Sequence, residues 1–267
     1  MQSSLIYSLQ TTLILIIIPA AMVLLTKRLS RVANQQLVNA LGFNSQIYIG
    51  GLGIIIHELS HLLLAIIFRH KIDAVCLIRI PNRNNPSDTS LGYVKHSWNP
   101  KSFYQSIGNV FIGVAPVFGS LFIIFLILSK LDAPLVSVHN QIVQELFQHQ
   151  NTSNIIVAAR LIQLLLSIFQ LQLDSLPVTI LEILLVASVC FGGFDLSQAD
   201  LSAAKSAFIA LLLLVLIGSF LASLASFHIF SSAILVNSIV WIYLLFIIAI
   251  IILLTLNIIM WIIGRIF

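Results

Sequence analysis

The chain has 267 residues, of which 59% are hydrophobic and only 8% are charged, and its formal net charge is +4. A soluble domain usually carries about 25% charged residues, so the composition excludes an ordinary soluble protein and predicts an all-α polytopic membrane protein. The chain lacks a basic stripe with interleaved aromatic residues, which argues against nucleic acid as a partner. Cys76 and Cys190 form no CxxC motif, so neither a disulfide framework nor a cysteine metal cluster is expected.

The apolar blocks of the sequence predict about six transmembrane helices, because a bilayer core needs runs of about 20 apolar residues. They form one membrane-embedded domain, residues 1–267, in which an extra N-terminal helix precedes a core at roughly 47–227. Polar residues 30–46 are expected to be a connector, and the amphipathic stretch 155–173 an interfacial helix or a seventh span. The six predicted spans cover residues 5–26, 47–68, 104–129, 176–194, 202–227 and 236–263.

Residues 69–103, between the second and third predicted spans, are the most polar part of the chain. Strand-like sequences at Val75–Ile80 and Leu91–Trp98, separated by a turn-rich loop, predict a β-hairpin at the membrane edge. This segment holds more Lys and Arg than the other loops, which favours a position on the cytoplasmic side of a cell membrane. The histidines at 70, 96, 139 and 149 lie in polar segments and are expected to be solvated.

The third predicted span begins with the glycine-rich sequence SIGNVFIGVAPVFG, which contains Asn109 and Pro116. Proline in a membrane helix frees a backbone carbonyl that another group must satisfy, so a bend or a partly unwound segment is expected there. Asn109 is a candidate to bind the substrate backbone or to stabilise an oxyanion. A hydrogen bond between packed helices is the alternative role for its side chain.

The sequence His57-Glu58-Leu59-Ser60-His61 lies within the second apolar block. Residues four positions apart face the same side of a helix, so both imidazoles can bind one zinc ion. Glu58 follows the first histidine and is placed to act as a general base on an activated water molecule. An unpaired glutamate in a membrane helix costs about 2.5 kcal/mol or more, and a bound cation offsets that cost. The motif therefore predicts a Zn²⁺ site with Glu58 as the catalytic residue.

These residues resemble the site-2-protease family of intramembrane zinc metalloproteases, and more narrowly a bacterial branch of it. The resemblance covers residues 47–205 and rests on HELSH, the hairpin-like segment after it, SIGNVFIGVAPVFG, and FDLSQADLSAAKS. It implies a third zinc ligand from an aspartate at a distant helix start. Asp200 fits that position best and Asp195 is the rival, although the family's usual Asp-Gly pair is absent; Glu182 is a weaker candidate.

Ser197 and Asp200 have the S-x-x-D spacing of a helix capping box, so Asp200 has a structural role available as well as a ligand role. Taken together, the sequence predicts a zinc endopeptidase in the lipid bilayer that cleaves membrane proteins or peptides. Two alternatives remain open: a non-catalytic membrane scaffold that retains a zinc site, and a metal transporter. A scaffold has no need of Glu58, and a transporter needs a second ligand cluster on another span.

Overall fold

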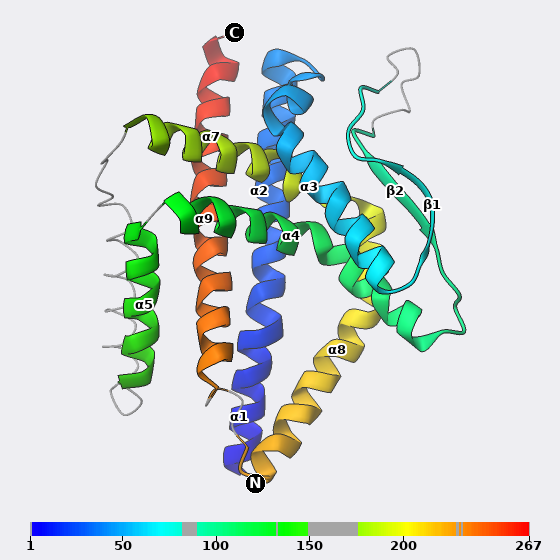
Figure 1. Cartoon of the computed structure of the whole chain (residues 1–267), viewed down its shortest axis with the longest axis vertical. Coiled ribbons are helices and arrows are strands. Elements are labelled where there is room, and N and C mark those ends of the chain that lie inside the picture. Colours follow the sequence, from blue (N-terminus) through cyan, green and yellow to red (C-terminus); the bar gives the residue numbers. More distant parts are fainter. Residues whose placement is uncertain are drawn as a thin grey trace.

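Figure 1 shows the computed structural model of the chain, which consists of helices and one small β-hairpin. The structure describes residues 2–81, 90–131, 133–148, 176–227, 230 and 232–266. The predicted amphipathic helix at 155–173 lies outside these residues. Four helical segments are long and apolar enough to cross a membrane: Gln2–Leu41, Ser45–Ile67, Phe103–Leu128 and Ala233–Arg265.

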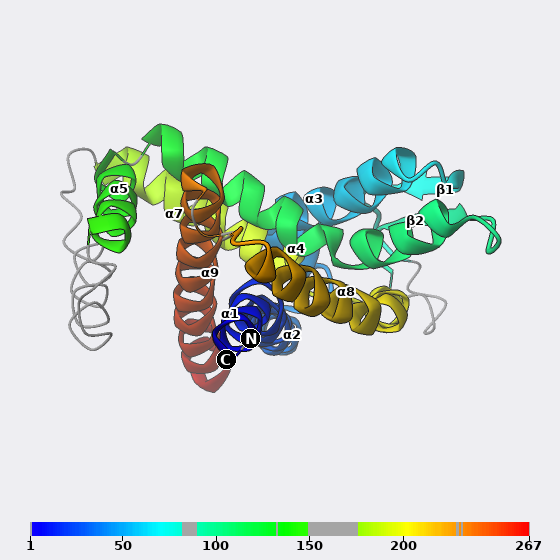
Figure 2. The same cartoon turned by 90° about the horizontal axis from the view of Figure 1, so that it is seen from below.

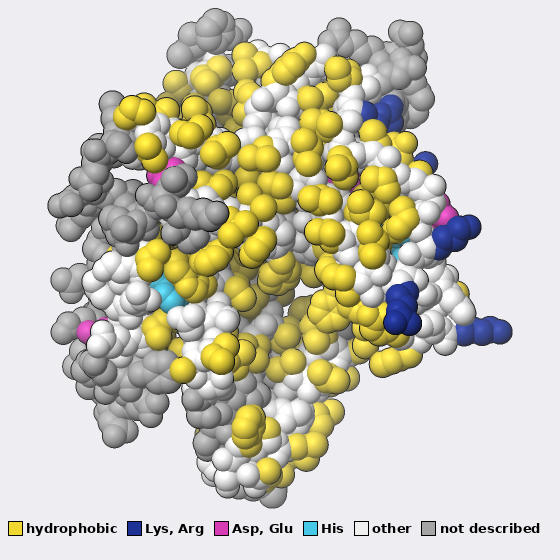
Figure 3. Space-filling view, viewed as in Figure 1, with side chains coloured by type: hydrophobic (Ala, Val, Ile, Leu, Met, Phe, Trp, Pro, Cys, Tyr) yellow, Lys and Arg dark blue, Asp and Glu magenta, His cyan; other side chains and the backbone are white. Residues whose placement is uncertain are grey.

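The prediction of a membrane protein agrees with these four segments, but the predicted count of six spans is not confirmed. The fourth and fifth predicted spans correspond to α7 (Leu176–Gly193) and α8 (Gln198–Leu224), whose apolar parts are shorter than the other four. Large apolar side chains cover much of the face in Figure 3, and residues such as Leu63 and Leu214 are more than half exposed. An apolar surface of this extent is suited to contact with lipid.

The N-terminal helix is longer than the sequence predicted. It comprises α1 (Gln2–Thr12), a π-helical stretch at Leu13–Ile17 and α2 (Ile18–Leu41). The predicted connector at 30–46 is therefore wrong up to residue 41. Its polar side chains do not need solvent, because Ser30 and Asn34 point at backbone carbonyls of α7. The helix ends at Gly42, whose φ of 83° is accessible to glycine without steric cost.

The predicted hairpin is confirmed. After α3 (Ser45–Ile67), strand β1 (Lys71–Cys76) pairs antiparallel with β2 (Tyr93–Ser97), so both strands lie within a few residues of their predicted positions. A register shift between Ile72 and Ala74 interrupts the ladder. Lys and Arg side chains gather on the hairpin side of the molecule (Figure 3), where Lys71 and Lys95 are exposed.

The remaining helices are α4 (Phe103–Leu131), α5 (Ala133–Gln148), α7, α8 and α9 (Ala233–Ile266). Pro116 lies inside α4 without interrupting it, so the predicted unwinding is not present. In Figure 1, α2 and α9 run side by side along the long axis, whereas α4 and α7 cross them. Seen from below in Figure 2, α4 leads from the hairpin end of the molecule to α5 at the opposite end. Helices α3, α4, α7 and α8 meet where the HELSH sequence lies.

Candidate metal centre

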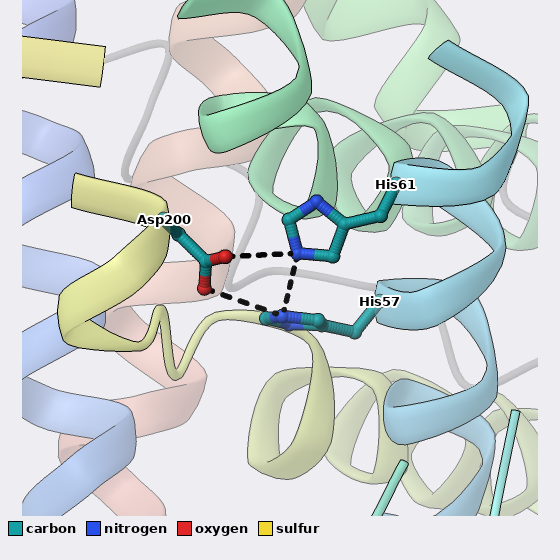
Figure 4. A group of neighbouring side chains, drawn as sticks. All are labelled: His57, His61 and Asp200. Atoms are coloured by element: carbon teal, nitrogen blue, oxygen red, sulfur yellow. Dashed lines mark hydrogen bonds and ion pairs between the residues drawn. The ribbon is translucent and has the colours of Figure 1, made fainter. Parts of the chain in front are cut away.

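His57 and His61 lie one turn apart on α3 and point in the same direction, as their spacing predicts (Figure 4). Their Nε2 atoms are 3.2 Å apart, and both side chains are buried. Two nitrogens bound to one tetrahedral zinc ion at 2.0–2.1 Å are about 3.4 Å apart. The separation of the two imidazoles is therefore close to that of a zinc site.

Each imidazole is oriented by a backbone carbonyl on a neighbouring helix. The Nδ1 atom of His57 lies 3.2 Å from the Gly193 carbonyl oxygen, and that of His61 lies 2.8 Å from the Ile112 carbonyl oxygen. A carbonyl oxygen can only accept, so each Nδ1 carries the proton and each neutral ring presents an Nε2 lone pair. Metal-binding histidines in metalloproteins are held by the same kind of second hydrogen bond.

Both carbonyls lack a hydrogen-bond partner within their own helix, and the sequence explains why. Ile112 is four residues before Pro116, which has no N–H, so its oxygen has no partner in the ladder of α4. Gly193 is the last residue of α7, and the last four carbonyls of a helix have no partner within that helix. Ser30 and Asn34 satisfy Cys190 and Phe191 in the same terminal turn, which leaves the Gly193 oxygen for His57.

Glycine residues allow α7 to approach α3 closely enough for this contact. A Cβ atom at Gly53 would lie 2.6 Å from the Gly193 nitrogen and from the Ser188 oxygen, and one at Gly192 would meet the backbone of Gly50. Real Cβ atoms do not tolerate contacts of this length with backbone atoms. The small residues before and after the motif therefore set the distance at which the Gly193 carbonyl meets His57.

Asp200 completes the group. One of its carboxylate oxygens is 3.3 Å from His61 Nε2 and the other is 3.8 Å from His57 Nε2 (Figure 4). The same side chain closes the predicted capping box at the start of α8, because its Oδ2 atom accepts from the Ser197 N–H at 2.7 Å. Ligand and cap are thus compatible in one carboxylate. His57, His61 and Asp200 together could hold a metal ion.

Asp195, the rival to Asp200, has a different partner. Its carboxylate lies 3.2 Å from the Arg31 guanidinium on α2, outside the His57–His61–Asp200 group. Burial raises the pKa of Asp195, while the neighbouring Arg31 works in the opposite direction. Glu182 is buried within α7 and is also outside the group. Of the three acids considered from the sequence, Asp200 is the one that the fold brings to the histidines.

A cavity of about 760 Å³ opens beside the three ligand side chains. Glu58 and Asn109, the predicted catalytic and substrate-binding residues, both line it. Strand β2 forms another wall, and Glu58 Cγ lies against Gly92, where a Cβ atom would be only 2.7 Å away. The cavity therefore places a carboxylate, an amide and three potential metal ligands around one space.

Sequence reasoning missed His96 and Trp98, which also line this cavity. His96 was expected to be solvated, and Trp98 was placed at the end of the second predicted strand. Their spacing of two residues on a strand puts them on the same face as each other, which is the signal that could have linked them. Only the folding of the hairpin back over α3 shows that this region of β2 lines the same cavity as His57, His61 and Asp200.

Comparison of the chain with protein families, with curated proteins and with solved structures gives no match.

Proposed function

We propose that this protein is a zinc metalloprotease that hydrolyses peptide bonds of membrane proteins or membrane-associated peptides. The observation that carries the proposal is the convergence of acceptors at one point. The Nε2 lone pairs of His57 and His61 face each other, and an Asp200 oxygen lies beside them. Three acceptors so close together, two of them buried, repel one another unless a proton or a metal cation lies between them. Two imidazoles and a carboxylate are the ligands of known catalytic zinc sites, in which a fourth position stays open.

Zinc at such a site lowers the pKa of a water molecule to about 7 and polarises a substrate carbonyl. The chain's own residues supply the remaining chemistry. Glu58, at the cavity wall next to His57, takes the proton from the attacking water and passes it to the leaving amine. Asn109, which also lines the cavity, donates its amide hydrogens to a substrate carbonyl or to the oxyanion that forms from it.

A substrate helix hides its amides in hydrogen bonds between residues four apart, so it must unwind locally before attack. The cavity lies between α3, α4, the start of α8 and strand β2, and polar groups line part of it. This arrangement supports a site that admits both water and an extended peptide segment. The resemblance of HELSH and its following segments to site-2 proteases points in the same direction.

Two measurements on purified protein test the proposal. We expect about one zinc ion per chain in the wild type and in Glu58→Gln, and a loss of zinc in His57→Ala. New protein N-termini should appear in membranes that contain the wild-type protein. Glu58→Gln should reduce their formation by a factor of about 100 or more, because the amide cannot act as a base. Zinc without any Glu58-dependent cleavage would favour a scaffold; zinc flux across vesicles would favour a transporter.

A further inference from the structure

A second pair of histidines lies outside the metal-binding group, where the hairpin joins α3 and α4. His70 follows the end of α3 and is buried, with 5% of its surface exposed. Its Nε2 atom is 2.9 Å from the Gln105 carbonyl oxygen, and its Nδ1 atom is 2.9 Å from Nδ1 of His96 on β2. A buried polar chain of this kind fixes the rings that take part in it.

The Gln105 carbonyl, at one end of this chain of hydrogen bonds, determines which ring nitrogen of His70 donates. The Gln105 carbonyl can only accept, so Nε2 of His70 donates, and in the Nε2–H tautomer Nδ1 of His70 presents a lone pair. His96 must then donate from Nδ1, which leaves its own Nε2 without a proton. Burial lowers the pKa of His96, the neighbouring His70 and His61 lower it further and Asp73 raises it, and the net direction favours the neutral ring.

The ring of His96 is also held in place by its surroundings. Trp98 stacks on His70, with ring centroids 5.9 Å apart and planes 18° from parallel. The Gln105 side chain donates to the Arg69 carbonyl at 2.6 Å and accepts from the Asn99 N–H at 2.7 Å. These bonds tie both ends of the hairpin to α4. The Nδ1 bond of His96 therefore goes to a buried partner that is itself held between the hairpin and α4.

His96 lines the same cavity as His57, Glu58 and His61. Among the described residues, its Nδ1 bond to His70 is the hydrogen bond that its ring makes. We propose that His96 is a substrate-binding residue of this cavity, and that its Nε2 atom accepts a hydrogen bond from a backbone N–H of the bound peptide. His70 acts as its positioning residue. This inference rests on the proposed function, because it assigns a wall of the cleft to the peptide.

The chemistry of an unwound substrate supports this role. Local unwinding of a helix exposes N–H groups that need new acceptors, since an unpaired amide in an apolar site is costly. The proposed metal and Asn109 interact with carbonyl oxygens of the peptide, whereas a neutral imidazole nitrogen can accept a hydrogen bond from one of its N–H groups. A fixed acceptor on β2 would therefore hold the peptide beside Glu58 while its carbonyl faces the metal-binding group.

The test measures binding without depending on cleavage. The protein is full-length, zinc-loaded Glu58→Gln in detergent, and the probe is a fluorescent Leu/Ala peptide of about 20 residues with a central Asn-Gly pair. A matched set of peptides replaces each central amide in turn with an ester, which removes one N–H. Dissociation constants are measured by fluorescence anisotropy for Glu58→Gln, for Glu58→Gln with His96→Phe, and for Glu58→Gln with Ser97→Ala. Ser97 is the exposed neighbour of His96 on β2 and serves as the control.

We expect one ester position to weaken binding to Glu58→Gln by about 2- to 10-fold, the range of a single net hydrogen bond. His96→Phe should remove this difference between ester and amide, and Ser97→Ala should keep it. A role of His96 in folding alone would weaken all peptides equally and leave the difference in place, which would overturn the proposal. Absence of any ester effect, or of peptide binding, would overturn it too. An ester effect in a protein that never cleaves peptide would contradict the protease function and leave the role of His96 standing.

Discussion

Replacing Gly53 with Ala should weaken metal binding although the new methyl group touches none of the three ligands. The added Cβ atom would meet the Gly193 nitrogen and the Ser188 oxygen at 2.6 Å, and both are backbone atoms that cannot rotate away. Helices α3 and α7 must therefore separate by about 0.8 Å to reach the 3.4 Å at which ordinary van der Waals contact begins. The hydrogen bond from His57 to the Gly193 carbonyl is already 3.2 Å long, and a shift of that size along it breaks the bond.

Loss of the partner that orients a metal-binding histidine typically lowers metal affinity by about 10- to 100-fold. We expect that range for Gly53→Ala, measured by competition with a chromophoric zinc chelator in detergent. Gly218→Ala on α8 is the matched control, because a Cβ atom there would meet nothing within 4 Å beyond its own stretch of helix, and zinc affinity should not change. Far-ultraviolet circular dichroism shows whether each variant stays helical. A folded Gly53→Ala protein with wild-type zinc affinity would refute the link between helix approach and histidine orientation.

Three further predictions concern the third ligand, the cap of α8 and the orientation in the membrane. Asp200→Ala should lower zinc occupancy more than Asp195→Ala, since only the first carboxylate lies beside the histidines; the opposite order in metal analysis would reassign the third ligand. Ser197→Ala removes the hydroxyl that caps α8, which typically costs about 0.5–2 kcal/mol of helix stability. Zinc affinity should fall in this variant and stay unchanged in Ser202→Ala, which lies about one turn further along α8. Asn99→Cys in a Cys76→Ser background should resist an impermeant thiol reagent in intact cells, because the positive charge of 69–103 favours the cytoplasmic side; ready labelling would reverse the orientation.

Local rules predicted the parts of the site that depend on residues close in sequence. The spacing of His57 and His61 determines that they share a face of α3, and the S-x-x-D pattern places Asp200 at a helix start. The rule that proline frees a carbonyl was correct as well. The rule could not identify the group that donates to the freed Ile112 carbonyl, because only the packing of α4 against α3 brings His61 to it.

The features that were missed depend on contacts between distant segments. The connector predicted at 30–46 is largely helix because Ser30 and Asn34 find acceptors about 160 residues away on α7. Polarity in a membrane protein can mean contact with another helix end as well as contact with water, and composition alone does not distinguish the two. The position of His96 at the cavity was missed for the same reason, because its polar segment folds back over the cavity.

Asp200 has two partners, because its carboxylate closes the first turn of α8 and also faces the histidine pair. Binding of the proposed metal would therefore be linked thermodynamically to the order of that turn. This linkage is reciprocal: if the metal stabilises the turn by a given factor, the intact turn raises the affinity for the metal by the same factor. Helix α8 runs on from this turn to pack against α1, close to the N-terminus of the chain (Figure 1). A change at the contact between α8 and α1 that displaces α8 would therefore alter the affinity for the metal.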